Sequence, residues 1–290
     1  MKQIDENTWL TGNVVLHRSD TAAWNDGSDN SSYTLTKASS PLPTTTTANS
    51  PYIKLVHEAG DASAVWSIGT NAFCKVRYNL KKVTPESATL KFVSGKQPSY
   101  KTPEVFHYAF DDDTSYLFIQ RLQGRTLDTA WPSLNDHWKR RYVDAVVEAC
   151  LEMAKWEAPA IGGVDGQYIP EYFLTGHNAD FSALRASCEE IGMNCSVFVF
   201  QHGDLGPPNI IVEEEPISGE IGFVDWEISG YLPRDWVRTK FRLSRGMDLP
   251  ASASEHPAWW RIEIQKALGA REFGDYAHAW GKWQTSITVN

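Results

Sequence analysis

Residues 201–226 constrain the fold of this chain more than any other segment. They begin QHGDLGPPNIIV and end FVDW, with EEEPISGE between. Two glycines and two prolines surround His202, Asp204 and Asn209, so the first part is too irregular for a helix and too polar for a core strand. The apolar runs on both sides of EEEPISGE predict a short β-hairpin. We therefore expect a loop that positions polar groups, followed by a hairpin that ends at Asp225.

This order of residues fits phosphoryl transfer. A loop of the form H-x-D-x-x-x-x-N, followed by a hairpin that ends in Asp, recurs in enzymes that transfer a γ-phosphoryl group. The triphosphate needs a metal ion, and Mg²⁺ prefers oxygen ligands, which Asn209 and Asp225 can supply. Asp204 can accept a hydrogen bond from a substrate hydroxyl. The alternative is that Asp204 and Asn209 only cap a turn and that Asp225 only ends a strand.

The region from Pro51 to Leu122 predicts an α+β unit. Its β-branched and aromatic runs are separated by Gly, Asp and Asn, which indicates antiparallel strands, at 52–60, 64–69, 72–78, 104–110 and 115–122. The segment TPESATLKFVSG predicts a helix after the third strand. Thr84 is a suitable N-cap, Pro85 suits the first helical position, and Gly95 is a plausible stop.

The rest of the chain is predicted to be mainly helical, apart from its first fifty residues. Apolar side chains recur at helical spacing in 136–156, and further helices are expected near 180–191 and 258–283. Residues 18–51 are rich in Ser, Thr, Asn, Asp and Pro, which predicts a mobile extension or a loosely attached arm. Three divisions are expected. Residues 1–50 form a polar extension that is partly flexible, residues 51–122 form the first lobe, and residues 123–290 form a helical second lobe.

Composition narrows the class of protein. The net charge of -9 argues against a general nucleic-acid binder, because such proteins displace phosphate counterions with a basic surface. There is no apolar run of 18 residues and no basic-then-apolar start, so we expect neither a membrane span nor a secretory signal. The four cysteines lack metal-binding spacing, and we expect reduced thiols in a cytoplasmic protein.

The chain resembles the aminoglycoside phosphotransferase and choline kinase-like family, and within it the fungal aminoglycoside phosphotransferase-like branch. HGDLGPPNII is similar to the catalytic loop of that family, and FVDWEISGYLPRDW to its metal-binding segment. IGGVDG and YLFIQRLQGRTLDTAW also resemble that group. The resemblance covers roughly residues 51–245 and implies an α+β, two-lobed protein-kinase-like fold, with an antiparallel sheet and a helix in the N-lobe and a mainly helical C-lobe. It also implies ATP and Mg²⁺ as cofactors.

The resemblance gives expected roles to residues of the first lobe and its inserted helix. Lys75 corresponds to the lysine that binds the α- and β-phosphates, and Glu86 to the glutamate that pairs with it. Alternatively, Lys75 only faces solvent and Glu86 only complements the helix dipole. Gln120 and Leu122 bound the hinge, where backbone groups meet the adenine.

The phosphate-covering loop departs from the protein-kinase pattern. It reads HEAGDASAVW and has only Gly60 where protein kinases carry several glycines. Small-molecule kinases of this family often lack those glycines, so Gly60, Asp61, Ala62 and Ser63 are the expected phosphate-covering residues. Contact is expected through backbone N–H groups and the Ser63 side chain.

The catalytic loop receives the remaining roles. The resemblance implies that Asp204 orients or deprotonates the acceptor hydroxyl and that Asn209 and Asp225 hold the metal. His202 belongs to the same catalytic loop, where bracing by hydrogen bonds is favoured over a part in the chemistry. Glu227 either pairs with a nearby arginine or acts beside the metal. The prolines inside the loop stiffen it and remove backbone donors.

The leading hypothesis is therefore an ATP- and Mg²⁺-dependent phosphotransferase that acts on a hydroxyl of a small molecule. We expect no nucleic-acid or membrane partner, and the oligomeric state stays open. The alternatives are a nucleotide-binding pseudokinase and a kinase-fold protein with other chemistry on a bulky molecule. In the last case the tryptophans near the end of the chain would line a pocket rather than pack in the core; they are Trp259, Trp260, Trp280 and Trp283. Acidic candidates for binding a cationic acceptor are Glu171, Asp180, Asp235, Asp248 and Glu255.

Overall fold

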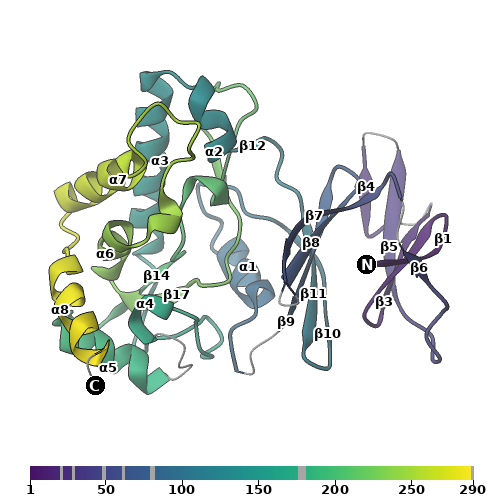
Figure 1. Cartoon of the computed structure of the whole chain (residues 1–290), viewed down its shortest axis with the longest axis horizontal. Coiled ribbons are helices and arrows are strands. Elements are labelled where there is room, and N and C mark those ends of the chain that lie inside the picture. Colours follow the sequence, from purple (N-terminus) through teal and green to yellow (C-terminus); the bar gives the residue numbers. More distant parts are fainter. Residues whose placement is uncertain are drawn as a thin grey trace. The chain divides into compact units, whose positions relative to one another are not determined.

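The computed structural model describes residues 1–19, 22–27, 30–47, 50–60, 63–78, 82–175 and 181–288 (Figure 1). The chain divides into two compact units. Unit 1 comprises Met1–Lys81 and Pro103–Leu122, and unit 2 comprises Lys82–Thr102 and Gln123–Asn290. None of the described helices has both the length and the apolar character needed to span a membrane.

A five-stranded antiparallel sheet in unit 1 confirms the five strands predicted between residues 52 and 122. Its order is β10-β11-β9-β8-β7, with β7 (Ile53–Ala59), β8 (Ser63–Ile68), β9 (Ala72–Tyr78), β10 (Val105–Asp111) and β11 (Thr114–Gln120). Lys75 lies directly opposite Val65 on β8 and Leu117 on β11. Because side chains alternate along a strand, these three share one face of the sheet.

The first residues of the chain form a second antiparallel sheet in unit 1. Its order is β4-β5-β3-β2-β1-β6, with β1 (Lys2–Asp5), β2 (Thr8–Thr11), β3 (Val14–Arg18), β4 (Trp24–Asp26), β5 (Ser31–Lys37) and β6 (Thr46–Thr47). This differs from the mobile extension expected there. The physical reason is that a few large side chains, Trp9, Leu16 and Tyr33, are fully buried among the polar ones. Large buried side chains of this kind supply much of the area that a sheet needs to pack.

One hydrophobic core joins the two sheets of unit 1. Trp9, Leu16 and Tyr33 of the first sheet belong to the same buried cluster as Cys74 and Phe118 of the five-stranded sheet. Cys74 precedes Lys75 on β9, so the two side chains point to opposite faces. The N-terminal sheet therefore covers the face that does not carry Lys75.

A buried aspartate fixes the turn between β8 and β9. Asp26, only 1% exposed, accepts hydrogen bonds from the backbone N–H of Thr70 and, at 2.5 Å, from the Thr70 hydroxyl. Gly69 has a left-handed backbone with φ of 54°, and a Cβ there would collide with the Asp26 carboxylate. Glycine is thus required at this position because it tolerates a positive φ and because there is no room for a Cβ.

Unit 2 contains eight α-helices within its described residues. They are α1 (Glu86–Gly95), α2 (Leu127–Ala130), α3 (Asp136–Met153), α4 (Tyr172–Thr175), α5 (Phe181–Ile191), α6 (Trp236–Leu243), α7 (Trp259–Ala270) and α8 (Ala277–Thr288). The predicted helices in 136–156, near 180–191 and in 258–283 are confirmed, and the last region contains two helices. Helix α7 packs against both α3 and α6 (Figure 1).

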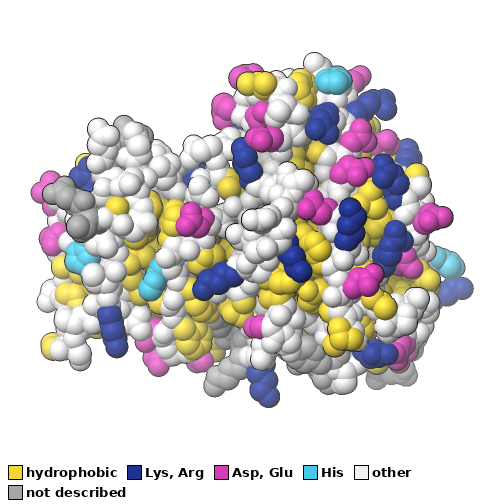
Figure 2. Space-filling model, turned by 180° about the vertical axis from the view of Figure 1, so that it is seen from behind, with side chains coloured by type: hydrophobic (Ala, Val, Ile, Leu, Met, Phe, Trp, Pro, Cys, Tyr) yellow, Lys and Arg dark blue, Asp and Glu magenta, His cyan; other side chains and the backbone are white. Residues whose placement is uncertain are grey.

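The described residues of unit 2 also form two three-stranded sheets and three 3₁₀ turns. One sheet has the order β12 (Arg125–Thr126), β15 (Ile210–Val212), β16 (Ile221–Phe223), and the other the order β13 (Glu157–Ala158), β14 (Phe198–Gln201), β17 (Gly230–Pro233). The 3₁₀ turns are η1 (Trp131–Ser133), η2 (Pro207–Asn209) and η3 (Arg245–Met247). Strands β15 and β16 are antiparallel neighbours, which confirms the predicted hairpin. On the face seen in Figure 2, basic and acidic side chains are mixed rather than gathered by sign.

The start of α1 differs in detail from the prediction. The N-cap residue is Pro85, and no side chain caps the helix. The Thr84 hydroxyl instead donates a hydrogen bond to Asp165 at 2.6 Å. Thr84 is therefore used by a tertiary contact with the IGGVDG segment, and it is not available to the first turn of the helix.

Candidate active site

The polar loop lies between β14 and β15, where a stiff backbone sets the direction of its side chains. Gly203 has φ of 82°, and a Cβ there would lie 2.8 Å from the Ile228 carbonyl oxygen. Pro207 and Pro208 then begin the 3₁₀ turn η2, which ends at Asn209. Because proline fixes φ, these residues limit the freedom of Asn209 relative to Asp204.

Asn209 is held against Asp204. Its Nδ2 donates hydrogen bonds to the Asp204 backbone oxygen and to Asp204 Oδ2, each at 3.0 Å. An amide has donors only on its nitrogen, so this contact leaves Asn209 Oδ1 as a neutral oxygen acceptor. The backbone oxygen of Asn209 also accepts from the Val224 N–H at 3.0 Å, which joins the loop to the segment that precedes Asp225.

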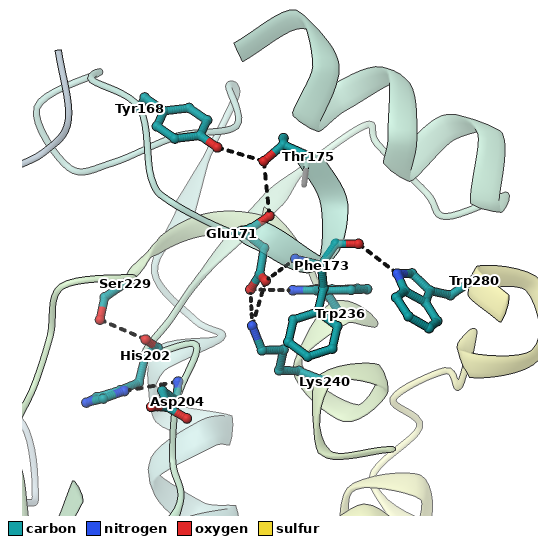
Figure 3. A network of polar contacts seen from close by, with 10 residues as sticks. All are labelled: Tyr168, Glu171, Phe173, Thr175, His202, Asp204, Ser229, Trp236, Lys240 and Trp280. Atoms are coloured by element: carbon teal, nitrogen blue, oxygen red, sulfur yellow. Dashed lines mark hydrogen bonds and ion pairs between the residues drawn. The ribbon is translucent and has the colours of Figure 1, made fainter. Parts of the chain in front are cut away.

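His202 braces the same loop from inside unit 2. Its side chain is buried, Nε2 lies 3.0 Å from the Val224 carbonyl oxygen, and Nδ1 accepts the Asp204 N–H at 3.3 Å. The Ser229 hydroxyl donates to the His202 carbonyl oxygen at 2.9 Å (Figure 3). The imidazole also contacts the Trp226 ring, with 4.5 Å between centroids. Both ring nitrogens thus have main-chain partners, which fits bracing better than a part in the chemistry.

Asp225 follows β16 in a backbone conformation that few residues adopt. Its φ is 67°, in the left-handed region that Asp tolerates better than most non-glycine residues. The next residue, Trp226, is fully buried, and its indole N–H donates to the Phe223 carbonyl oxygen at 3.0 Å. The Trp226 backbone N–H donates to Glu86 Oε1 at 3.2 Å. Glu86 is the first residue of α1, so the helix and the Asp225 segment are tied together within unit 2.

The surroundings of Asp204 shift its acidity. Burial raises the pKa of the Asp204 carboxyl above its ordinary value, and the negative charges of Asp225 and Glu171 act in the same direction. The positive charge of Lys240 and the hydrogen bond from Asn209 lower the pKa and offset part of this rise. A carboxylate with a raised pKa is a better proton acceptor than an ordinary aspartate.

A buried ion pair lies next to Asp204 and has no signature in the sequence. Glu171 is completely buried, and Lys240 Nζ lies 2.6 Å from both of its carboxylate oxygens. The Trp236 indole N–H and the Phe173 backbone N–H also donate to Glu171, at 3.1 and 3.2 Å (Figure 3). Glu171 and Lys240 are far apart in sequence, so only the tertiary fold brings them together.

This pair corrects one hypothesis about the acceptor. Glu171 has its acceptor positions filled inside the protein and is not free to bind a cationic substrate. Three other candidates also hold the fold: Asp235 accepts from the Gly274 N–H, Asp248 pairs with Arg261, and Glu255 pairs with Lys139. Asp180, the fifth, lies outside the described residues.

The late tryptophans belong to the packing of unit 2. Trp260 is fully buried, with its indole N–H bonded to the Leu205 carbonyl oxygen at 3.1 Å. Trp280 and Trp283 pack against the hydrophobic cluster built on α5, β14 and α6. The half-buried Trp259 contacts the Trp131 ring. These contacts support a core role and remove the main reason to expect an aromatic-lined pocket there.

The remaining predicted residues are in unit 1. Lys75 is in the middle of β9, Gly60 forms the turn after β7 with φ of 54°, and Ser63 begins β8. Gln120 ends β11, where its N–H and its side-chain oxygen bind the main chain of Glu104. Leu122 is the last residue of unit 1. Asp61 and Ala62 lie outside the described residues.

The donor set of the loop fits Mg²⁺ better than a soft metal. Within the described part of the chain, no group of three or more His, Cys, Asp and Glu side chains is placed to hold a metal ion. Asn209 and Asp225 offer one neutral and one anionic oxygen. Mg²⁺ is usually bound by one or two carboxylates together with water and substrate phosphates, so two protein ligands are sufficient.

Comparisons with known proteins give the fold. No protein-family model matches the chain, and no curated protein matches it. The solved structure of aminoglycoside phosphotransferase APH(3'')-Id from Streptomyces rimosus matches with a TM-score of 0.52 and 15% identity, over 80% of this chain and 91% of that one.

Two further solved structures are similar. An aminoglycoside-3'-phosphotransferase of type VIII has a TM-score of 0.49 and 15% identity, over 80% of this chain and 94% of that one. APH(2'')-IIa, in a ternary complex with streptomycin and ATP, has a TM-score of 0.48 and 13% identity, over 80% of each chain. At the identity of the Streptomyces protein the likeness shows the fold alone. The chain has the two-lobed, protein-kinase-like α+β fold found in aminoglycoside phosphotransferases.

Proposed function

We propose that this protein is an ATP- and Mg²⁺-dependent phosphotransferase that acts on a hydroxyl group of a small molecule. The observation that carries the proposal is the hydrogen bond from Asn209 to Asp204 in a proline-stiffened loop, with the Asp225 segment bonded to the same loop. A loop that only made a turn would not need a carboxylate with a raised pKa beside a second aspartate in a left-handed conformation. Perturbed acids of this kind cluster at functional sites.

The proposed roles of the nucleotide-binding residues follow from their chemistry. Bound ATP with Mg²⁺ supplies the γ-phosphoryl group and neutralises its charge. Asn209 Oδ1 and the Asp225 carboxylate would hold the metal ion. Lys75 binds the phosphates and Glu86 orients Lys75. We assign the phosphate-covering turn to Gly60 and Ser63, and the adenine contact to the strand end at Gln120 and Leu122.

Asp204 is the proposed proton acceptor. It accepts a hydrogen bond from the acceptor hydroxyl and aligns the oxygen for in-line attack. As the acceptor oxygen forms its bond to the γ-phosphorus, the bond from that phosphorus to ADP would break and ADP would leave, while the hydroxyl proton passes to the Asp204 carboxylate. His202 keeps the loop in place through its two main-chain contacts.

The test is a transfer assay on the full chain. We would incubate it with ATP, MgCl₂ and a panel of amino alcohols, aminoglycosides and sugars, and measure ADP release and phosphorylated product. We expect transfer that disappears without MgCl₂ and in Asp204→Asn. No transfer, together with no nucleotide binding by calorimetry, contradicts the proposal.

Two other results would point to different functions. ATP binding without turnover, unchanged in Asp204→Asn, would identify a pseudokinase. Turnover of a small molecule that needs neither ATP nor Mg²⁺ would identify a kinase fold adapted to another reaction.

A further inference from the structure

A small cavity lies behind the catalytic loop, inside unit 2. Helices α3 and α6 and the turn η3 supply its apolar wall, which includes Met153 and Phe241. Its polar wall consists of Gln201, His202, Asp204 and Lys240. About 20 Å³ is open to the centre of a water molecule. That volume is roughly what one water needs.

Gln201 has an unsatisfied group at this cavity. The residue ends β14, its side chain is only 3% exposed, and its Nε2 has no hydrogen-bond partner among the described residues. Buried amide groups in folded proteins are almost always bonded to protein or to ordered water. The Gln201 amide therefore needs an acceptor, and the cavity is where one fits.

Lys240 has a donor to spare. Its ammonium group carries three N–H bonds, and the two carboxylate oxygens of Glu171 account for two of them. The ammonium also lies 4.6 Å from the centre of the Phe173 ring. One N–H is thus left for the cavity that Lys240 lines.

Asp204 has an acceptor to spare. Asn209 donates to Oδ2, and no described hydrogen bond reaches Oδ1. The polar wall thus offers two donors, from Gln201 and Lys240, and one acceptor, from Asp204. The charge of Lys240 disfavours a metal cation in this space, and the polar wall disfavours an apolar occupant.

We propose that this cavity binds one water molecule, which accepts hydrogen bonds from Gln201 Nε2 and Lys240 Nζ and donates one to the Asp204 carboxylate. Three polar partners are typical of a buried water. The water joins the Glu171–Lys240 pair to Asp204 and satisfies the Gln201 amide. The site lies behind the loop, between α3 and α6, and its lining does not include the proposed metal ligands Asn209 and Asp225.

The water gives Gln201 a positioning role, and this part rests on the proposed function. With Asn209 on one carboxylate oxygen and the water on the other, Asp204 is held at both oxygens. Loss of the water frees the carboxylate to rotate away from the acceptor hydroxyl. Substitution of Gln201 should then lower kcat roughly tenfold and change KM little, because the interaction acts on the reacting geometry rather than on substrate binding.

The first experiment is a high-resolution crystal structure of the full chain, with the variants Gln201→Met and Met153→Leu. Gln201→Met keeps the length of the side chain and removes the amide, whereas Met153→Leu alters only the apolar wall. We expect a water peak in contact with Gln201, Lys240 and Asp204 in the wild type and in Met153→Leu, and none in Gln201→Met. An empty cavity in the wild type, or an unchanged peak in Gln201→Met, overturns the proposal.

Kinetics separate the water site from the proposed function. The crystal structures need no turnover, so they decide the water site even if the protein transfers no phosphate. If transfer is observed, a tenfold fall in kcat for Gln201→Met but not for Met153→Leu supports the positioning role, and equal kcat values overturn it. If Gln201→Met does not fold, the wild-type density alone decides whether the water binds.

Discussion

Asp26 in unit 1 binds the turn between β8 and β9, whereas Asp204 in unit 2 lies in the turn after β14, and their surroundings differ in one respect. Each turn includes a left-handed glycine, Gly69 or Gly203, that leaves no room for a Cβ. Both carboxylate oxygens of Asp26 accept hydrogen bonds from Thr70, whereas only one oxygen of Asp204 has a described partner. Asp204 also lies among charges of both signs. A carboxylate whose two oxygens are both bound by groups of the chain stabilises the fold, and one that keeps an oxygen open to water or substrate can take part in a reaction.

The largest expected effect separates the two aspartates by activity. Asp204→Asn should lower turnover by about 10³-fold, because the amide cannot accept the hydroxyl proton. Asp26→Asn keeps the shape of a residue that we place outside the reaction, so its turnover per folded molecule should equal that of the wild type. Steady-state kcat, corrected for the folded fraction by circular dichroism, measures both. Similar losses in the two variants would break the comparison.

The second prediction compares how much the two aspartates contribute to the free energy of unfolding. Asp26→Ala leaves the N–H and the hydroxyl of Thr70 without their buried partner, which should lower the free energy of unfolding by about 3 kcal/mol. Asp204→Ala removes a partly buried carboxylate with a raised pKa and should cost less. Urea unfolding monitored by tryptophan fluorescence gives both values. A larger loss for Asp204→Ala would show that the loop at Asp204 carries more of the stability than its contacts suggest.

The two glycines sharpen the comparison. Gly69→Ala and Gly203→Ala each force a Cβ into a left-handed backbone and against a neighbour, and each should cost about 1–2 kcal/mol of folding stability. Only Gly203→Ala should also lower kcat, because Gly203 precedes Asp204. The matched measurement is kcat at a temperature where both variants are fully folded. A similar fall in kcat for Gly69→Ala would contradict the separation.

The smallest effect is the pH dependence of stability that Asp204 contributes. Burial raises the pKa of this carboxyl above the ordinary value of 3.8, so the folded state binds its proton more tightly than the unfolded state. At pH values between the pKa of this carboxyl in the unfolded state and its pKa in the folded state, the free energy of unfolding falls as pH rises. The wild type should therefore lose stability relative to Asp204→Asn as the pH increases from about 4 through the raised pKa. Unfolding curves of both proteins over that range test this, and a difference that does not vary with pH would show that burial leaves the pKa unchanged.

Local sequence patterns were enough to predict the elements around the candidate site. The five strands between residues 52 and 122, the hairpin after Asn209 and the long helix after residue 136 all follow from alternation, turn residues and helical spacing. The polar loop could be recognised because a short segment with glycine, proline, histidine and aspartate fits neither a helix nor a core strand. Each of these signals comes from residues that are close together in the chain, so a single sequence is enough to show it.

The features that the sequence did not predict depend on tertiary contacts. Residues 18–51 are expected to be mobile or loosely attached because of their polar composition, which conceals the few large side chains that the sheet buries. Thr84 was expected to cap α1, and Asp165 binds it instead. Lys240 and Glu171 meet only after α6 has packed, so neither residue type nor spacing could pair them. The same holds for the cavity at Gln201.

The hydrogen bond from Trp226 to Glu86 has a thermodynamic consequence for this site. It joins the first turn of α1 to the main chain beside Asp225. If binding at Asp225 shifts that main chain, the shift reaches α1 through this hydrogen bond, and the coupling free energy is no larger than the contact supplies. Linkage is reciprocal, so a contact that shifts α1 changes the affinity at Asp225 by an equal amount. The helix can therefore report on the occupancy of the site, and it can also control that occupancy.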